Sequence, residues 1–171
     1  MQATLAPSFD MTSTSKSGAG VSPGVGGCTC FKLRGLTRRV TALYDRALAP
    51  SGINVNQYSL LAHLAGANAV SVSGLAVLLA ADRTTVTRNL QPLLAAGYVE
   101  VGLGANARTR ALSITHRGKA VLATARPFWK SAQRSMRDVA GETALAALHN
   151  LVDVVSLRLS ATHGPDHQGK K

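Results

Sequence analysis

The sequence predicts a mainly α fold with one small β-hairpin. Amphipathic segments with apolar residues every three or four positions begin and end the patterned part of the chain, at about 28–50 and 142–159. Between them, two short apolar segments at 71–79 and 82–94 are joined by a sharp turn. Two strand-like runs, 98–101 and 111–114, follow at once and flank a glycine-rich loop. At 171 residues the chain has room for one domain with a core and tails.

The first patterned segment predicts a long amphipathic helix over about 28–50. Basic side chains fill much of its polar face, and Pro50-Ser51-Gly52 ends it. A second helix is predicted at about 54–67, before the two short apolar segments. Residues 1–27 are poor in charge and rich in Ser, Thr and Gly, so we expect a disordered N-terminal tail there.

The C-terminal part predicts two further helices within about 116–160. The first contains Pro127, which should bend it. The second carries a narrow apolar stripe suited to packing on another helix, made of Leu145, Leu148, Val152, Val155 and Leu159. Either this stripe packs within its own chain, or the first and last helices pair with a second copy. Because two terminal stripes exceed what one small core covers, we favour a homodimer. Residues 162–171 are expected to form a flexible tail.

The two short segments predict a helix-turn-helix whose second helix has a polar outer face. Asp82 is placed to cap that helix by accepting hydrogen bonds from the amides of Thr84 and Thr85. The face opposite its apolar stripe has short or forked polar groups suited to phosphates and base edges in a major groove of DNA: Thr84, Thr87, Arg88 and Gln91. Simple solvation of that face is the alternative, and Thr85 either reaches a phosphate or serves only the helix start.

The predicted hairpin adds basic side chains next to this helix. Arg108 lies near its tip and Arg110 on its return strand, where an arginine can enter a minor groove; an ordinary exposed arginine is the alternative. The net charge of +11 fits a polyanionic partner, although it also suits an anionic membrane surface. The predicted DNA-binding residues are Ser71, Arg83, Thr84, Thr85, Thr87, Arg88, Gln91, Arg108 and Arg110.

Residues 28–160 resemble a MarR-family winged helix-turn-helix transcriptional regulator. The matching segments are Ser71-x-x-x-Leu75-Ala76, Asp82-Arg83-Thr84-Thr85-Val86-Thr87-Arg88-x-Leu90-x-x-Leu93, Gly97-Tyr98-Val99 and Arg108-x-x-x-Leu112-x-Ile114-Thr115-x-x-Gly118. The resemblance implies a regulator over 28–161, with a DNA-binding head at about 54–115 and N- and C-terminal dimerisation helices. It implies a homodimer that binds a palindromic operator in double-stranded DNA, usually as a repressor. A non-specific architectural DNA-binding protein is the alternative.

Three features depart from the family pattern, and one of them is a wing that is poor in charge around Gly102-Leu103-Gly104-Ala105. Asn106 stands where the family usually has an aspartate that braces the wing arginine. Pro92 falls within the second helix of the helix-turn-helix, so we expect a regular helix over 82–91 and a bend after it.

The resemblance also implies a small aromatic or phenolic effector bound between the dimerisation helices and the head. Its candidate lining residues are Phe31, Arg39, Tyr58, His63 and Trp129. The alternatives are that Phe31 and Tyr58 are core residues, that His63 only satisfies its own helix, and that Arg39 is a solvated charge.

A second possible input is oxidation of a thiol. Cys28-Thr29-Cys30-Phe31-x-Leu33 resembles the segment around the reactive cysteine of the organic-hydroperoxide-sensing branch, and Tyr44 matches a tyrosine of that branch. A helix N-terminus favours the thiolate, so Cys28, Cys30 and Tyr44 are redox candidates. The alternative is that both cysteines are small residues at a helix start.

Other function classes receive no support from the residues. No catalytic arrangement is recognisable among the eight acidic residues and the hydroxyl side chains, so we expect no enzyme and no cofactor. Two cysteines at this spacing with scattered histidines do not form a recognisable metal site. The longest apolar run found, Leu75 to Ala81, is too short for a membrane helix, and no secretory signal is apparent. We therefore expect a cytoplasmic protein that does not bind membranes.

Overall fold

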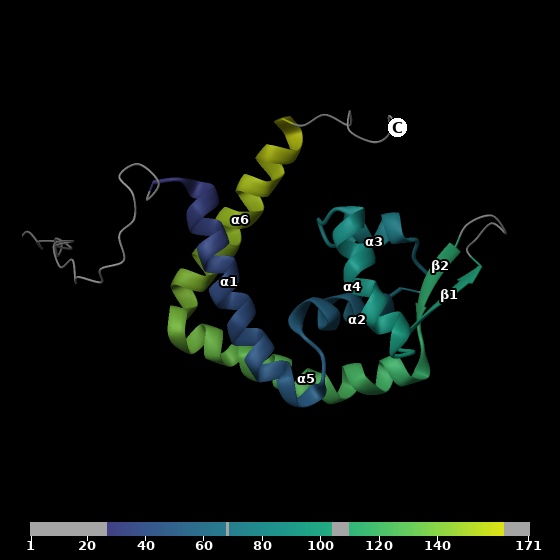
Figure 1. Cartoon of the computed structure of the whole chain (residues 1–171). Helices are drawn as coiled ribbons and strands as arrows, with labels where there is room; N and C mark the ends of the chain where they lie inside the picture. The colour runs from purple at the N-terminus through teal and green to yellow at the C-terminus, as the bar shows by residue number, and fades with distance from the viewer. Residues whose placement is uncertain (1–26, 68, 104–109, 163–171) are drawn as a thin grey trace, which may run out of the picture. The chain divides into compact units, whose positions relative to one another are not determined.

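A computed structural model describes residues 27–67, 69–103 and 110–162, and confirms the mainly α fold with one hairpin. The chain divides into two compact units between Leu36 and Thr37. The predictions for the two tails and for the hairpin tip, including Arg108, lie outside the described residues. Figure 1 shows α2, α3 and α4 grouped beside the hairpin of β1 and β2.

Helix α1 covers Thr29–Leu48 and is followed by a 3-10 turn, η1, at Ala49–Ser51. Gly52 ends this turn with φ of 74°, a left-handed conformation that glycine adopts without strain. Helix α2 covers Val55–Ala65, slightly shorter than the predicted 54–67. It begins with a capping box, in which Asn54 and Gln57 each accept a hydrogen bond from the other's backbone amide.

The helix-turn-helix consists of α3, Val72–Leu78, and α4, Arg83–Ala95. Helix α4 continues through Pro92, so the proline does not end it. In the turn before α4, Ala80 has φ of 47°, a left-handed conformation that is uncommon for a residue with a Cβ. Its amide is bonded to Val77, and the next amide, of Ala81, to Ala76, which holds this tight turn in place.

Strands β1, Val99–Leu103, and β2, Arg110–Ile114, pair antiparallel, with Val99 opposite Ile114 and Leu103 opposite Arg110. An isolated bridge joins the hairpin to the segment before α3. The amide of Val70 donates to Leu112 at 3.2 Å, and the amide of Leu112 donates back at 2.8 Å. These two hydrogen bonds therefore join the hairpin to the segment that leads into the helix-turn-helix.

The core lies where α2 packs against α3, α4, α5 and β2. Its centre is formed by fully buried leucines, at most 2% exposed, which are Leu48, Leu60, Leu61, Leu64, Leu75, Leu90 and Leu93. Because α4 contributes Leu93 and Leu90 to this cluster, its opposite face is left to solvent.

Helix α5, His116–Ala140, starts at the end of β2 and is capped by Thr115, whose hydroxyl accepts from the Gly118 amide. Pro127 lies inside α5 and, like Pro92 in α4, does not end the helix. Helix α6 follows at Glu142–Thr162. Leu145 is buried, but the stripe beyond Leu148 is exposed together with its apolar neighbours; the exposed residues are Leu151, Val152, Val154, Val155, Leu157 and Leu159.

One helix in the described part of the chain, α6, is long and apolar enough to cross a membrane by length and composition, with a mean hydropathy of 1.2 over Glu142–Ala161. The sequence prediction overlooked it because Asp153 and Arg158 interrupt its apolar run. Only 6% of the window is buried, and one helix of this kind is weak evidence of a membrane span.

Candidate DNA-binding site

The start of α4 is fixed by Asp82, as the sequence predicted. Its carboxylate accepts a hydrogen bond from the Thr85 amide at 2.8 Å and another from the Thr85 hydroxyl at 2.6 Å. These bonds, with the hydroxyl bond as the largest contribution, hold the pKa of Asp82 below its usual value. The Thr85 hydroxyl is thus engaged within the helix start. This favours a role in starting the helix over a contact with a DNA phosphate.

The outer face of α4 presents the polar side chains that the sequence placed there. Thr84, Thr87, Arg88 and Gln91 are all exposed, whereas Val86 on the inner face is 2% exposed. The Thr87 hydroxyl donates to the Arg83 carbonyl at 2.8 Å, which leaves its oxygen able to accept. An exposed helix with an arginine between short polar groups has the shape and chemistry to enter a major groove.

Two further predicted residues flank α4. Ser71 is the N-cap of α3, where its hydroxyl accepts from the Gly74 amide at 3.0 Å. Arg110 is exposed and begins β2, opposite Leu103 at the last described pair of the hairpin. The structure therefore brings α4, the start of α3 and the hairpin strand that carries Arg110 into one head.

The base of the hairpin is held to α5 by contacts that the sequence reasoning missed. Thr115 donates from its amide to the Tyr98 carbonyl at 3.0 Å and from its hydroxyl to the Gly97 carbonyl at 2.7 Å. The Arg117 guanidinium lies 5.4 Å from the centre of the Tyr98 ring, a cation–π distance. The signal available in the sequence was Arg117, two residues after the capping Thr115. The contact could not be predicted from it, because Tyr98 is distant in sequence.

A sequence profile of the MarR family matches residues 51–108. The M. tuberculosis transcriptional regulator MosR, solved in complex with DNA, is 33% identical with a TM-score of 0.66, and the match covers 76% of this chain and 97% of that one. The chain belongs to the MarR family. It is accordingly a transcriptional regulator of the winged helix-turn-helix type and not an enzyme. No curated protein sequence matches the chain.

Two more distant structures share the fold. A mutant of MarR from E. coli complexed with operator DNA is 19% identical with a TM-score of 0.70, covering 78% of this chain and 99% of that chain. Bordetella bronchiseptica BpsR, whose DNA binding is regulated by 6-hydroxynicotinic acid, is 21% identical with a TM-score of 0.70, covering 80% and 98%.

Of the five residues expected to line an effector site, only Tyr58 and Trp129 are in contact with each other. Tyr58 on α2 and Trp129 on α5 stack, with ring centres 5.5 Å apart and planes at 14°. His63 is exposed, and its Nδ1 lies 2.7 Å from the Ser59 carbonyl of its own helix, so it does not join the stack. Arg39 is exposed, and Phe31, which is 46% exposed, belongs to the other compact unit.

The structure adds Arg126 to this aromatic pair. Burial raises the pKa of Tyr58, while the charge of Arg126 and its hydrogen bond to the phenol act in the opposite direction. Arg126 and Trp129 are three residues apart on α5, a spacing that places them on neighbouring positions of one helix face. That spacing was the signal that sequence reasoning missed.

The thiol candidates occupy the beginning of α1. Cys28 and Cys30 are both free and exposed, and the Cys28 carbonyl accepts from the Lys32 amide as the helix starts. Tyr44 is buried on the same helix; burial raises its pKa, and the charge of Arg137 opposes that rise. Among the residues described, no group of three metal-ligating side chains comes together.

The capping carboxylate gives a testable dependence on pH. Because the pKa of Asp82 is lowered in the folded protein, its contribution to stability is present above the unfolded pKa of about 3.9 and is lost as pH falls through the folded value. Asp82→Asn keeps an accepting cap but does not titrate. We expect the melting temperature of the wild type, relative to this variant, to decline only below about pH 4. A constant difference from pH 7 to pH 2 would contradict the assignment.

Proposed function

We propose that this MarR-family protein is a repressor that binds an inverted-repeat operator in double-stranded DNA as a homodimer. The observation that carries the proposal is the exposed polar face of α4, with Thr84, Arg88 and Gln91 opposite a buried apolar face. It is supported by a relative of 33% identity whose structure was solved with DNA. Two such heads would enter successive major grooves about one helical turn apart.

The apolar surface of α6 supports the homodimer. Val152 and Val155 of the apolar stripe are each 46% exposed in the single chain, and a soluble helix rarely leaves such a surface uncovered. A second copy covers such a stripe by pairing it with the same helix, which gives a two-fold symmetric contact.

Arg88 is the residue whose removal tests base reading. In the proposed complex its guanidinium donates two hydrogen bonds to a guanine, so Arg88→Ala should weaken operator binding by about 1–3 kcal/mol and relax sequence preference at one position in each half-site. Fluorescence anisotropy with operator and scrambled duplexes measures both effects. Arg134→Ala removes the same charge from the exposed part of α5 and serves as the matched control.

Two results would contradict this proposal. Unchanged operator affinity in Arg88→Ala would remove Arg88 from the base-reading set. Equal affinity of the wild type for operator and scrambled duplexes would favour the architectural alternative.

For the effector, we infer a small aromatic acid bound against Tyr58 and Trp129. The stacked rings offer an aromatic surface, and Arg126 beside the phenol supplies a charge for a carboxylate. Trp129 is the single tryptophan of the chain, so its fluorescence reports this site directly. Quenching by an aromatic acid that Arg126→Gln abolishes would support the inference, and quenching unaffected by that variant would refute it.

The exposure of both thiols favours oxidant sensing as a second candidate function. Cys30 lies in the first turn of α1, where the helix dipole stabilises a thiolate. Release of operator by an organic hydroperoxide that Cys30→Ser prevents would establish this input; release that persists in Cys30→Ser would exclude Cys30.

A further inference from the structure

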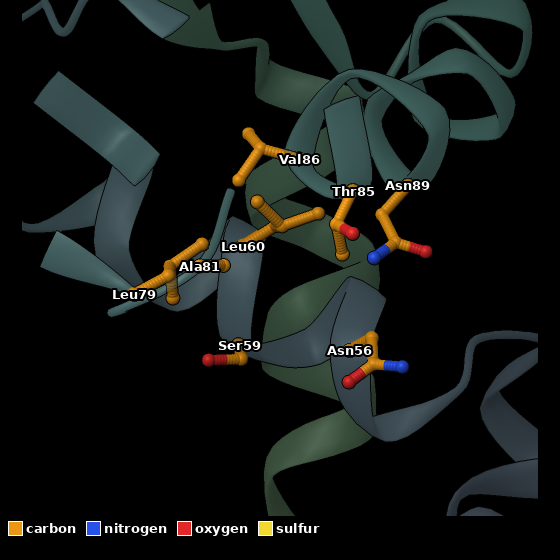
Figure 2. A pocket seen from close by; sticks show the side chains of 8 residues that line it. All are labelled: Asn56, Ser59, Leu60, Leu79, Ala81, Thr85, Val86 and Asn89. Carbon is orange, nitrogen blue, oxygen red and sulfur yellow. The ribbon is translucent and has the colours of Figure 1, made fainter. Parts of the chain in front are cut away.

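A cavity of about 170 Å³ lies behind α4, between this helix, α2 and the turn that precedes α4 (Figure 2). It is separate from the Tyr58–Trp129 stack, since neither ring lines it. Its lining residues come from three segments close to the helix-turn-helix and are Asn56, Ser59, Leu60, Leu79, Ala81, Thr85, Val86 and Asn89.

The walls of the cavity are held in place from both sides. Leu60 and Val86 belong to the buried core, each 2% exposed. Thr85 is fixed by its two hydrogen bonds to Asp82, and the capping box at Asn54 fixes the first turn of α2 next to Asn56. The cavity is therefore formed in the unbound protein, which lowers the cost of ordering a site for a ligand.

Three of the polar lining residues, Asn56, Thr85 and Asn89, lie on one side of the cavity. In Figure 2 the carboxamides of Asn56 and Asn89 lie on the same side as Thr85, whereas Leu79 and Ala81 lie opposite, together with the hydroxyl of Ser59. Asn56 is exposed and Asn89 is half-buried, and within the described part of the chain neither carboxamide has a hydrogen-bond partner from the protein. Each offers two N–H donors and an accepting oxygen.

The lack of charged lining residues favours an uncharged ligand in this cavity. None of the eight lining residues is ionisable, so a carboxylate entering the cavity would lose hydration without gaining a cation. The Asp82 carboxylate, bonded to the hydroxyl of the lining residue Thr85, adds repulsion against an anion. An aromatic acid therefore suits the Arg126 site and not this cavity.

We propose that this cavity binds a small uncharged aromatic carboxamide, with one ring against Leu60, Leu79 and Val86 and the amide between Asn56 and Asn89. A cavity of about 150 Å³ accommodates benzene, so about 170 Å³ admits one ring with one small substituent. The occupant touches α4 on the side opposite its DNA-facing residues. Any effect on operator binding rests on the proposed function, but binding to the cavity does not.

Benzamide and benzoate form a matched pair of probes, because they share a ring and differ in charge and in N–H donors. Titration of the full-length, isotope-labelled protein should give saturable changes at the backbone amides of Asn56, Ser59 and Asn89 with benzamide. Benzoate should bind there at least tenfold more weakly. Equal affinities, changes centred on the Trp129 indole, or no saturable change with benzamide would overturn the proposal.

Variants of the lining residues test the polar side of the cavity. Asn56→Ala and Asn89→Ala should each weaken benzamide binding about fivefold through loss of one hydrogen bond. Asn150→Ala removes an exposed carboxamide from α6 and should leave the affinity unchanged. Ser59→Leu should fill the cavity and abolish binding while circular dichroism shows a folded protein. Unchanged benzamide affinity in both asparagine variants would refute the assignment.

Operator binding is measured separately on the ligand-free protein. Loss of the proposed DNA function therefore leaves the benzamide titration interpretable, and failure of the titration leaves the DNA result intact.

Discussion

Placing two aspartates on the exposed stripe of α6, as Val152→Asp with Val155→Asp, should yield a monomer with operator affinity reduced by a factor of about 10² to 10⁴. Both valines are 46% exposed in the single chain, so the substitutions cost little within it. In the proposed dimer, each aspartate would face an apolar surface without a partner for its charge. The affinity falls because the second head no longer binds as part of the same molecule.

Sedimentation equilibrium measures the oligomeric state, and anisotropy measures operator affinity. Asn150→Asp introduces the same charge on the same helix, away from the stripe, and should remain dimeric. A double variant that stays dimeric would show that α6 does not form the contact. A monomeric variant with wild-type operator affinity would show that the two heads are not coupled.

The largest loss of stability is expected from Gly118→Ala, at the start of α5. A Cβ at this position would lie 2.1 Å from the Tyr98 carbonyl oxygen and 2.8 Å from Cγ1 of Ile114. Neither neighbour can move freely, because the Tyr98 carbonyl accepts from Thr115 and Ile114 is paired in the hairpin. Overpacking of this kind costs about 3 kcal/mol or more, since backbone atoms must shift.

Thermal unfolding checks this expectation, with a fall in melting temperature of roughly 6 °C or more for a chain of this length. Gly35→Ala is the matched control, because a Cβ there meets no atom within 4 Å and α1 gains about 0.5–1 kcal/mol in helix propensity. Gly118→Ala should therefore lower the melting temperature and Gly35→Ala raise it. An unchanged melting temperature in Gly118→Ala would mean that α5 can move away from the hairpin.

Local signals in the sequence predicted most of the fold. Asp82 was recognised as a cap because a carboxylate before an amphipathic run satisfies the free amides of the first turn. The helix-turn-helix and the hairpin followed from short patterns that tertiary packing did not override. Pro92 and Pro127 were expected to bend their helices rather than end them, and both helices do continue through these residues.

The parts of the site that depend on distant residues were not predictable in the same way. Tyr58 and Trp129 were both proposed as effector residues, but their stacking depends on how α2 packs on α5. The cavity behind α4 combines two asparagines 33 positions apart with apolar residues from a turn. No sequence period brings such residues together, because their proximity is a property of the packed helices.

The paired bonds between Val70 and Leu112 have a consequence for how such a regulator can be switched. They join the hairpin to the segment that leads into α3, so in the proposed DNA complex the hairpin and the helix-turn-helix would approach the duplex as one unit. In that case, we expect a signal to move the hairpin and the helix-turn-helix together rather than one without the other. In a dimer, the remaining variable is the distance between whole heads, so an effector should change occupancy of the operator without changing which sequence is preferred.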